Sequence, residues 1–361
     1  MGAYRVPPFP GLVLQRVSRD DGAHRALGEC CRARARTMLT DTLSDVLRAV
    51  RLHGAIFFAV DGRAPWVAES PAARVIAPHL LPGVEHVIEY HMVTRGSCWA
   101  GLTDQPAVRL ETGDVIVFPR GDAHVLSSAP GMRGEVEETA FHSASHRPLP
   151  ITLSLQGDGQ ERTGVICGFF GCDARPFNPL LNTLPAVIHL RGSGDGHSVL
   201  RTLVELAVDE SSSAKPGGQV MLARICELLF VEMVRRYLTT LPPEEVGWFA
   251  ALRDPTVGRA LQKLHERPAH NWSLDGLARE VGVSRTLLAE RFAHIVGIPP
   301  IQYLAQWRMQ LAASLLRTST ASLAQIADGV GYGSEAALSR AFKRYVGIAP
   351  APYRRDKHRP L

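Results

Sequence analysis

The chain has 361 residues, a formal net charge of +5 and 45% hydrophobic residues, values that are ordinary for a soluble globular protein. Its length exceeds what a single compact core usually occupies, so we expect two or three structural units. No stretch approaches the roughly 18 uninterrupted apolar residues that a membrane span requires, which excludes a membrane protein.

The charge is distributed unevenly. Residues 253–361 carry 16 Lys and Arg against 8 Asp and Glu, whereas residues 39–252 carry 17 against 24. A basic segment beside an acidic body is typical of a protein that binds a polyanion, because Lys and Arg that neutralise phosphates release condensed counterions. A solvated charged surface would give the same numbers, so charge alone does not decide the function.

The cysteine spacing and the N-terminus favour a cytoplasmic protein. Six cysteines lack the dense spacing of a secreted disulfide scaffold and form no paired CxxC zinc motif. The N-terminus holds several arginines but no apolar core of a signal peptide. We expect residues 1–38 to be a disordered extension, and Met38 to be a candidate for the true start.

The first patterned segments predict one helix followed by a β-rich region. Residues 41–53 place Leu43, Val46 and Val50 at helical spacing, which predicts a short amphipathic helix. From there to about residue 190, brief apolar runs separated by Gly, Pro and Asp predict the strands of a sandwich or barrel. The runs are GAIFFAV, HVIEYHMV, AVRLE, DVIVFP and GVICGFF.

Helical patterns return after the β-rich region, at residues 197–210 and 219–238. The second has one apolar stripe, which would pack either in the core or against a second copy of the chain. LPPEEVG at 241–247 has the composition of an interdomain linker.

The strongest signal is an internal repeat in the last ninety residues. SLDGLAREVGVSRTLLAERF at 273–292 is similar to SLAQIADGVGYGSEAALSRAF at 322–342. Each copy has a Ser N-cap, a short helix, a Gly turn and a second helix, which are the parts of a helix-turn-helix. Ser322 and Gln325 also match a capping box. One such pattern is common in helix bundles, but two copies joined by a helix, with a basic surplus, predict DNA binding in successive major-groove turns.

The stretch from Asp254 through Arg354, ending GVGYGSEAALSRAFKRYVGIAPAPYRR, resembles the DNA-binding domain of the AraC family of bacterial transcription regulators. The resemblance implies recognition helices at about 284–294 and 334–345. The groove-facing positions would then be Arg285, Thr286, Ala289 and Glu290 in the first helix, and Glu335, Ala336, Ser339 and Arg340 in the second.

The two recognition helices differ in the side chains they offer to bases. The best-known members often carry amide or basic side chains where this chain has Ala289 and Glu290. We therefore expect discrimination to rest mainly on Arg340, through a bidentate contact to guanine. Lys343, Arg344 and Arg354 are expected to contact phosphates, which position the protein without specifying a sequence.

GDVIVFPRGDAH at 113–124 has the spacing G-x5-P-x-G-x2-H and resembles the second cupin motif, and EYHMVTRG at 89–96 is similar to a degenerate first motif. The region resembles the cupin-type sensor domain of a subgroup of AraC-like regulators. The expected fold is α+β and multidomain. It comprises a cupin-like β-barrel at 39–190, a helical dimerisation or linker region at 195–247, and an all-α double helix-turn-helix domain at 252–355.

The resemblance also implies partners. We expect a cytoplasmic, nucleoid-associated homodimer that binds promoter DNA, RNA polymerase and a small-molecule or stress effector. An activator is the expectation, but the sequence encodes neither the sign of regulation nor the effector or the promoters.

Three residues of the β-rich region suggest a metal site. Glu89 and His91 fall on one face of a strand, and His124 matches the metal ligand of the second cupin motif, so these side chains could hold a divalent ion. The paired histidines of metal-loaded cupins are missing at 82–85. We therefore expect a barrel without a metal or other cofactor, and the metal site is the alternative. The same absence argues against a cupin oxygenase or isomerase, the enzymatic alternative.

The cysteines of the β-rich region allow two interpretations. Cys98, Cys167 and Cys172 could act as an oxidation switch by forming a disulfide, with Cys167 and Cys172 flanking GFFG. Alternatively, they are buried thiols that pack as small hydrophobic groups.

Overall fold

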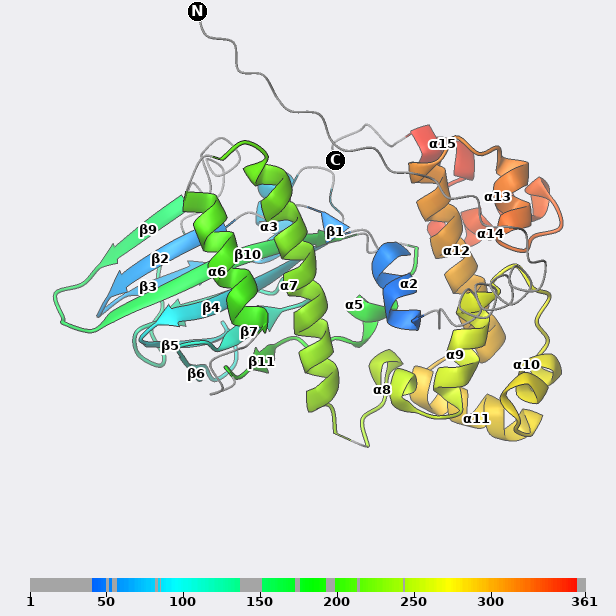
Figure 1. Cartoon of the computed structure of the whole chain (residues 1–361), viewed down its shortest axis with the longest axis horizontal. Coiled ribbons are helices and arrows are strands. Elements are labelled where there is room, and N and C mark those ends of the chain that lie inside the picture. Colours follow the sequence, from blue (N-terminus) through cyan, green and yellow to red (C-terminus); the bar gives the residue numbers. More distant parts are fainter. Residues whose placement is uncertain are drawn as a thin grey trace, which may run out of the picture. The chain divides into compact units, whose positions relative to one another are not determined.

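The computed structural model in Figure 1 describes residues 41–49, 52–53, 57–81, 84, 86–136, 151–172, 176–192, 199–212, 215–242 and 244–355. The expected N-terminal extension, residues 1–38, lies outside the described residues, as does Met38. Within the described ranges, no helix is both long enough and apolar enough to cross a membrane.

The β-rich region forms two sheets, as the run of short strands predicted. The larger sheet has the strand order β11-β7-β4-β10-β2-β9, with β1 paired to β10. Its strands are β1 (Leu52–His53), β2 (Phe57–Arg63), β4 (His86–Arg95), β7 (Val115–Phe118), β9 (Ile151–Gln156), β10 (Arg162–Cys172) and β11 (Ile188–Leu190). The smaller sheet has the order β3-β8-β5-β6. Its strands are β3 (Val67–Ser70), β5 (Ser97–Leu102), β6 (Val108–Glu111) and β8 (His124–Ser127).

The central strands β4 and β10 are buried on both faces. Successive side chains of a strand point to opposite faces, so one strand can contribute to two cores. Val87 and Val93 of β4 lie in the core between the sheets, whereas Ile88 and Tyr90 belong to a second apolar cluster outside the larger sheet. Gly168 of β10 pairs with Tyr90, and a Cβ at Gly168 would overlap the tyrosine ring.

Two helices cover the outer cluster. Helices α6 (Val199–Ser212) and α7 (Gly218–Thr240) run side by side (Figure 1), and α7 contacts β11. The ring of Phe230 on α7 meets the ring of Phe170 on β10 edge-on, with centroids 5.2 Å apart. The shorter helices of this region are α3 (Ala73–Leu80) and α5 (Pro179–Thr183).

The C-terminal region is helical and repeats the predicted pattern. Its helices are α8 (Trp248–Arg253), α9 (Val257–Glu266), α10 (Leu274–Val281), α11 (Arg285–Val296), α12 (Pro300–Thr318), α13 (Leu323–Gly329), α14 (Glu335–Val346) and α15 (Pro350–Arg355). The predicted N-caps are confirmed, because Ser273 Oγ accepts from Gly276 N at 3.0 Å and Ser322 forms a capping box with Gln325.

The two repeats have separate cores that α12 connects. Tyr303, Leu304 and Trp307 of α12 belong to the first cluster, which also includes α9, α10 and α11. Further along α12, Met309 and Leu316 pack with α13, α14 and α15 in a cluster of their own. The first repeat therefore shares its apolar cluster with the outer face of the larger sheet, and the second does not.

The first helix of the described chain has an unexpected partner. The amphipathic pattern predicted it correctly as α2 (Thr42–Ala49), and we assigned it to the β-rich domain. In the structure α2 packs against α9 and α12 of the C-terminal region, with Leu43, Val46 and Ala49 buried.

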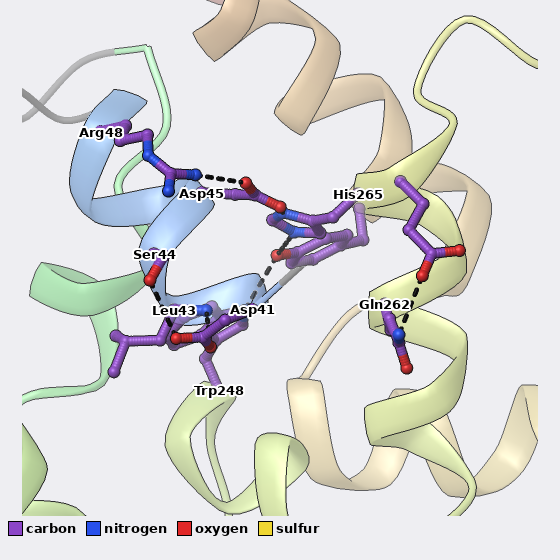
Figure 2. A network of polar contacts seen from close by, with 10 residues as sticks. Asp41, Leu43, Ser44, Asp45, Arg48, Trp248, Gln262 and His265 are labelled. Atoms are coloured by element: carbon purple, nitrogen blue, oxygen red, sulfur yellow. Dashed lines mark hydrogen bonds and ion pairs between the residues drawn. The ribbon is translucent and has the colours of Figure 1, made fainter. Parts of the chain in front are cut away.

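A buried polar network accompanies this packing (Figure 2). Trp248 Nε1 donates to the Tyr303 hydroxyl at 2.8 Å, and that hydroxyl lies 2.8 Å from His265 Nε2. The tyrosine oxygen thus accepts from Trp248 and also shares a hydrogen bond with His265 Nε2. Nδ1 lies 3.9 Å from Asp45 Oδ2 on α2. Burial lowers the pKa of His265 to about 3, so the ring is neutral at physiological pH.

Candidate functional site

The candidate DNA-reading surface consists of α11 and α14. Each helix starts at a serine cap: Ser284 Oγ accepts from Leu287 N and Ser334 Oγ accepts from Ala337 N, both at 3.2 Å. One face of each helix is buried, by Leu288 and Phe292 in α11 and by Leu338, Ala341 and Phe342 in α14. The opposite faces are left open to a groove, as the repeat predicted.

The predicted groove-facing side chains lie on these open faces. The exposed ones are Arg285, Thr286, Glu290, Glu335, Ala336 and Arg340, and Ala289 and Ser339 are half-buried. The expected phosphate contacts divide into two groups. Lys343 and Arg344 are exposed on α14, but Arg354 is half-buried, and its Nη2 donates to the Ala321 carbonyl at 2.6 Å. Arg354 thereby holds the residue that precedes the N-cap of α13.

Two arginines of α11 lie near acidic side chains but remain partly exposed. Arg285 Nη1 lies 3.7 Å from Asp275 Oδ2, an exposed pair of the kind that contributes little to stability. Arg291 Nε donates to Asp254 Oδ2 at 2.8 Å. The other oxygen of Asp254 accepts from Thr256 N and Val257 N, so this carboxylate also caps α9. The two recognition helices therefore present different charges, with Arg340, Lys343 and Arg344 exposed on α14.

Direct contact fixes the second turn against the first repeat. Arg308 of α12 donates through Nε to the Pro268 carbonyl at 2.7 Å and through Nη2 to the His270 carbonyl at 2.8 Å. Gly331, in the turn of the second repeat, has φ +82°, and a Cβ there would lie 2.6 Å from the Ala269 carbonyl oxygen. The spacing of the two recognition helices thus depends on this contact as well as on α12.

A second candidate site lies inside the barrel. Glu89 and His91 of β4 and His124 of β8 are buried, and one ligand atom of each lies within 4.8 Å of the other two. His124 Nδ1 donates to the Asp122 carbonyl at 2.9 Å, which leaves Nε2 as an acceptor. His91 Nε2 lies 2.7 Å from that atom and therefore carries the proton between them. Ser70 Oγ donates to Glu89 Oε2 at 3.0 Å.

Burial sets the charge of this cluster. It raises the pKa of Glu89 to about 8, although the hydrogen bond from Ser70 opposes the shift. It lowers the pKa of His124 to about 4 and the pKa of His91 below its usual range, the latter with a further contribution from His124. All three side chains are therefore mainly neutral at pH 7.

The donor set fits a divalent ion after a small adjustment. Glu89 Oε1 and His91 Nδ1 are buried without a hydrogen-bond partner. Two nitrogens bound tetrahedrally to zinc at about 2.0–2.1 Å lie about 3.3 Å apart, so the 2.7 Å between His91 and His124 must widen by about half an ångström. Side-chain rotation can supply this change, and the ion would stabilise the ionised form of Glu89.

A cavity of about 60 Å³ adjoins the cluster. Its walls are largely apolar, and they include Phe58, Val60, Leu126, Leu153 and Phe169. The polar and indole side chains that line it are Trp66, Glu69, Ser70, Glu89 and His91, and Trp66 Nε1 is buried without a hydrogen-bond partner. Trp66, Glu89 and His91 thus line this cavity and each has a buried polar atom without a hydrogen-bond partner, which is costly to the folded state. The sequence patterns singled out neither Trp66 nor Ser70.

Comparison with known proteins identifies the family. A cupin family model matches residues 41–239, and a helix-turn-helix domain model matches residues 277–356. A Streptomyces lividans protein named as an AraC-like transcription regulator is 32% identical over 89% of this chain and 100% of its own length. A protein of the same name from Streptomyces antibioticus is 33% identical over 87% of this chain and 98% of its own. The chain belongs to the AraC-like transcription regulators.

The predicted cupin fold and double helix-turn-helix are thus confirmed, and this AraC-like regulator is a DNA-binding protein rather than an enzyme. Its C-terminal region is also similar to the DNA-binding domain of AdpA, solved in complex with a target DNA. The identity is 31%, the match covers 30% of this chain and 98% of that one, and the TM-score is 0.28.

The cysteines of the regulator do not form the pair that their spacing suggested. Cys167 and Cys172 lie on one strand, β10, and face different cores. Five residues of strand separate their Cα atoms by about 17 Å, whereas a disulfide needs less than about 7 Å. Cys98 shares the inner core with Cys167, and burial raises the pKa of Cys98 to about 12 and of Cys167 further. Cys167 and Cys172 are therefore out of disulfide reach of each other in this fold, and all three thiols are buried.

The two turn glycines of the regulator give a matched test of the repeat contact. Gly282 (φ +76°) has open space where a Cβ would lie, whereas Gly331 faces the Ala269 carbonyl. We expect Gly282→Ala to lower the free energy of unfolding by about 1 kcal/mol, because alanine disfavours a positive φ. Gly331→Ala is expected to lower it by about 3 kcal/mol, because the new methyl group would also overlap the Ala269 carbonyl. Urea unfolding of the full chain measures both, and equal losses would contradict the contact.

Proposed function

We propose that this regulator recognises its promoter mainly through α14. The observation that carries the proposal is the difference in charge between the recognition helices. Arg340, Lys343 and Arg344 are exposed on α14, whereas Arg285 and Arg291 of α11 lie against Asp275 and Asp254. Arg340 contacts guanine through its planar fork, and Lys343 and Arg344 contact phosphates. Thr286, Ala289 and Glu290 of α11 face the groove and contribute position more than base discrimination.

In the same model of action, Glu335, Ala336 and Ser339 line the groove beside Arg340, and Arg354 acts by holding the start of α13 rather than by reaching the DNA. The regulator works in the cytoplasm, at the nucleoid, with RNA polymerase as a further partner. Chromatin precipitation that recovers the regulator without polymerase at every bound promoter would contradict the last point.

Arg340 and Lys343 provide a matched pair for the recognition test. Arg340→Ala is expected to weaken cognate binding by about 1–3 kcal/mol and to relax preference at one base pair. Lys343→Ala is expected to weaken binding to cognate and scrambled duplexes alike and to reduce the salt dependence by about one phosphate contact. Genome-wide footprinting first identifies a bound promoter fragment. Fluorescence anisotropy on that fragment then measures the affinity and the salt dependence of each variant. Unchanged cognate affinity in the Arg340 variant would refute the assignment.

We also propose that residues 195–247, between the sensor at 39–190 and the DNA-binding domain at 252–355, form a homodimer through α6 and α7. Large apolar side chains are exposed on both helices, and the most exposed is Val220 at 67%. On each helix two of them lie seven residues apart, Val199 and Leu206 on α6 and Met221 and Leu228 on α7. Exposed apolar stripes of this spacing are typical of a helical seam between two chains.

The dimer proposal predicts that charge on the stripes separates the protomers. The double variant Leu206→Glu, Leu228→Glu is expected to sediment as a monomer, because pairing would bury four carboxylates per dimer. Val246→Glu is the control, since Val246 is also exposed but lies in the linker. Sedimentation velocity distinguishes the outcomes, and a wild-type chain that is monomeric at micromolar concentration contradicts the proposal.

For the barrel we propose a sensory role, in which occupancy of the cavity by a small effector alters DNA binding. The apolar walls and the unpartnered atoms of Trp66, Glu89 and His91 support this role. A divalent ion held by Glu89, His91 and His124 is the second candidate occupant, supported by their convergence within 4.8 Å. The ion would supply a positive charge in the cavity and stabilise Glu89 as a carboxylate.

Zinc binding by the purified chain tests the second candidate. One equivalent per chain is expected to survive dialysis and to raise the melting temperature, because a ligand that binds only the folded state stabilises it. His91→Ala and His124→Ala are expected to abolish both effects, whereas His294→Ala, at an exposed position on α11, should retain them. Equal zinc retention by wild type and the His124 variant would exclude this site.

A further inference from the structure

Gln310 of α12 is a buried side chain whose partners lie outside the DNA-binding domain. It is 1% exposed. Its Nε2 donates to the carbonyl of Ala49, the last residue of α2, at 3.0 Å. Its Oε1 accepts from the backbone N–H of Phe177 at 3.1 Å. An apolar residue could fill the same volume, so the amide serves to satisfy two backbone groups of another part of the chain.

Both partners of Gln310 flank one strand pair of the larger sheet. Leu52 and His53 of β1 pair with Cys172 and Gly171 at the end of β10. Ala49 precedes β1 by three residues, and Phe177 follows β10 by five. We call α2, β1, the end of β10 and Phe177 the β1–β10 corner. Gln310 thus binds this corner from both sides.

The same strand, β10, reaches the cavity. Cys167 and Phe169 of β10 line it. They pair across the sheet with His91 and Glu89 of β4, the two cluster residues of that strand. β10 thus runs as one hydrogen-bonded strand from the cavity to Cys172, where its pairing with β1 begins.

The β1–β10 corner also contacts α12 at a second residue, Tyr303. The ring of Phe177 meets the ring of Tyr303 edge-on, with centroids 5.5 Å apart. Tyr303 receives the Trp248 hydrogen bond and lies beside His265, which faces Asp45 of α2 (Figure 2). The corner therefore contacts α12 about two turns apart, and α12 is the helix that joins the cores of the two repeats.

We propose that the β1–β10 corner, held by Gln310, transmits the occupancy of the barrel cavity to the DNA-binding helices by setting the position of α12. This inference rests on the sensory role proposed above. Gln310 acts here as a positioning residue, since it need not touch DNA or effector. The linker at 241–247 joins the regions covalently, and the corner carries the coupling between them.

A double-mutant cycle on the full-length chain tests the inference without knowledge of the effector. Ala68→Leu, on β3, fills part of the cavity and stands in for an occupant. Gln310→Leu and Gln310→Met each remove both hydrogen bonds while keeping the volume. Ala68→Leu is expected to change promoter affinity about threefold or more in the wild-type background and less than about 1.5-fold in either Gln310 background, the signature of an interrupted coupling.

The neighbouring Met309→Leu is the matched control, because Met309 lies on the same helix but packs in the second-repeat core. It is expected to leave the Ala68→Leu effect intact. Phe177→Leu removes the ring contact to Tyr303 while Gln310 stays, and it is expected to reduce the effect, so the test survives if the Gln310 variants fail to fold. Equal effects in wild-type, Gln310 and Phe177 backgrounds would overturn the corner as the route. No effect of Ala68→Leu in wild type would instead overturn the sensory role of the cavity, and the inference with it.

Discussion

Burial of α12 between two apolar clusters is the constraint on which the rest of the structure depends. Its first half, with Tyr303 and Trp307, lies in the cluster shared by the first repeat and the barrel face, and its second half, with Met309 and Leu316, lies in the core of the second repeat. A packed core does not deform continuously, so a helix shared by two cores moves as a unit. The position of α12 therefore determines both the spacing of the two recognition helices and their placement against the sensor.

The two repeats use the same local scaffold for different ends. Both start their recognition helices at a serine and bury an equivalent Phe, Phe292 or Phe342. In the first repeat, Asp254 and Asp275 draw in the arginines of α11. In the second, the basic side chains stay exposed, and the turn at Gly331 packs against the loop at Ala269. The first repeat is suited to positioning the protein on DNA, because acidic side chains lie near its arginines. The second repeat is suited to reading bases, because its basic side chains are exposed.

The barrel keeps a polar cluster where a core of this size would normally be apolar. A carboxyl group buried at Glu89 is tolerated because it is protonated and accepts a hydrogen bond from Ser70, and the His91–His124 pair shares one proton. Glu89 loses its usual charge on folding because burial raises its pKa to about 8, which disfavours the folded state at pH 7. Such residual cost is expected at functional sites, where local rules are broken for a purpose.

Local chemistry in the sequence determined much of this protein. Serine caps, turn glycines and apolar periodicity depend on neighbours within a few residues, so the helix-turn-helix repeat and the shared face of Glu89 and His91 were predictable. The bounds of α11 and α14 followed from the family resemblance to within two residues. Only the tertiary structure decided which distant groups meet. Amphipathicity showed that α2 has an apolar face, but not that α9 and α12 cover it. The spacing of Cys167 and Cys172 could not show that one strand holds them apart, and nothing near Gln310 in sequence marks it as the partner of Ala49 and Phe177. Such contacts depend on how separate elements pack, and the periodicity of one element does not show which other element covers its apolar face.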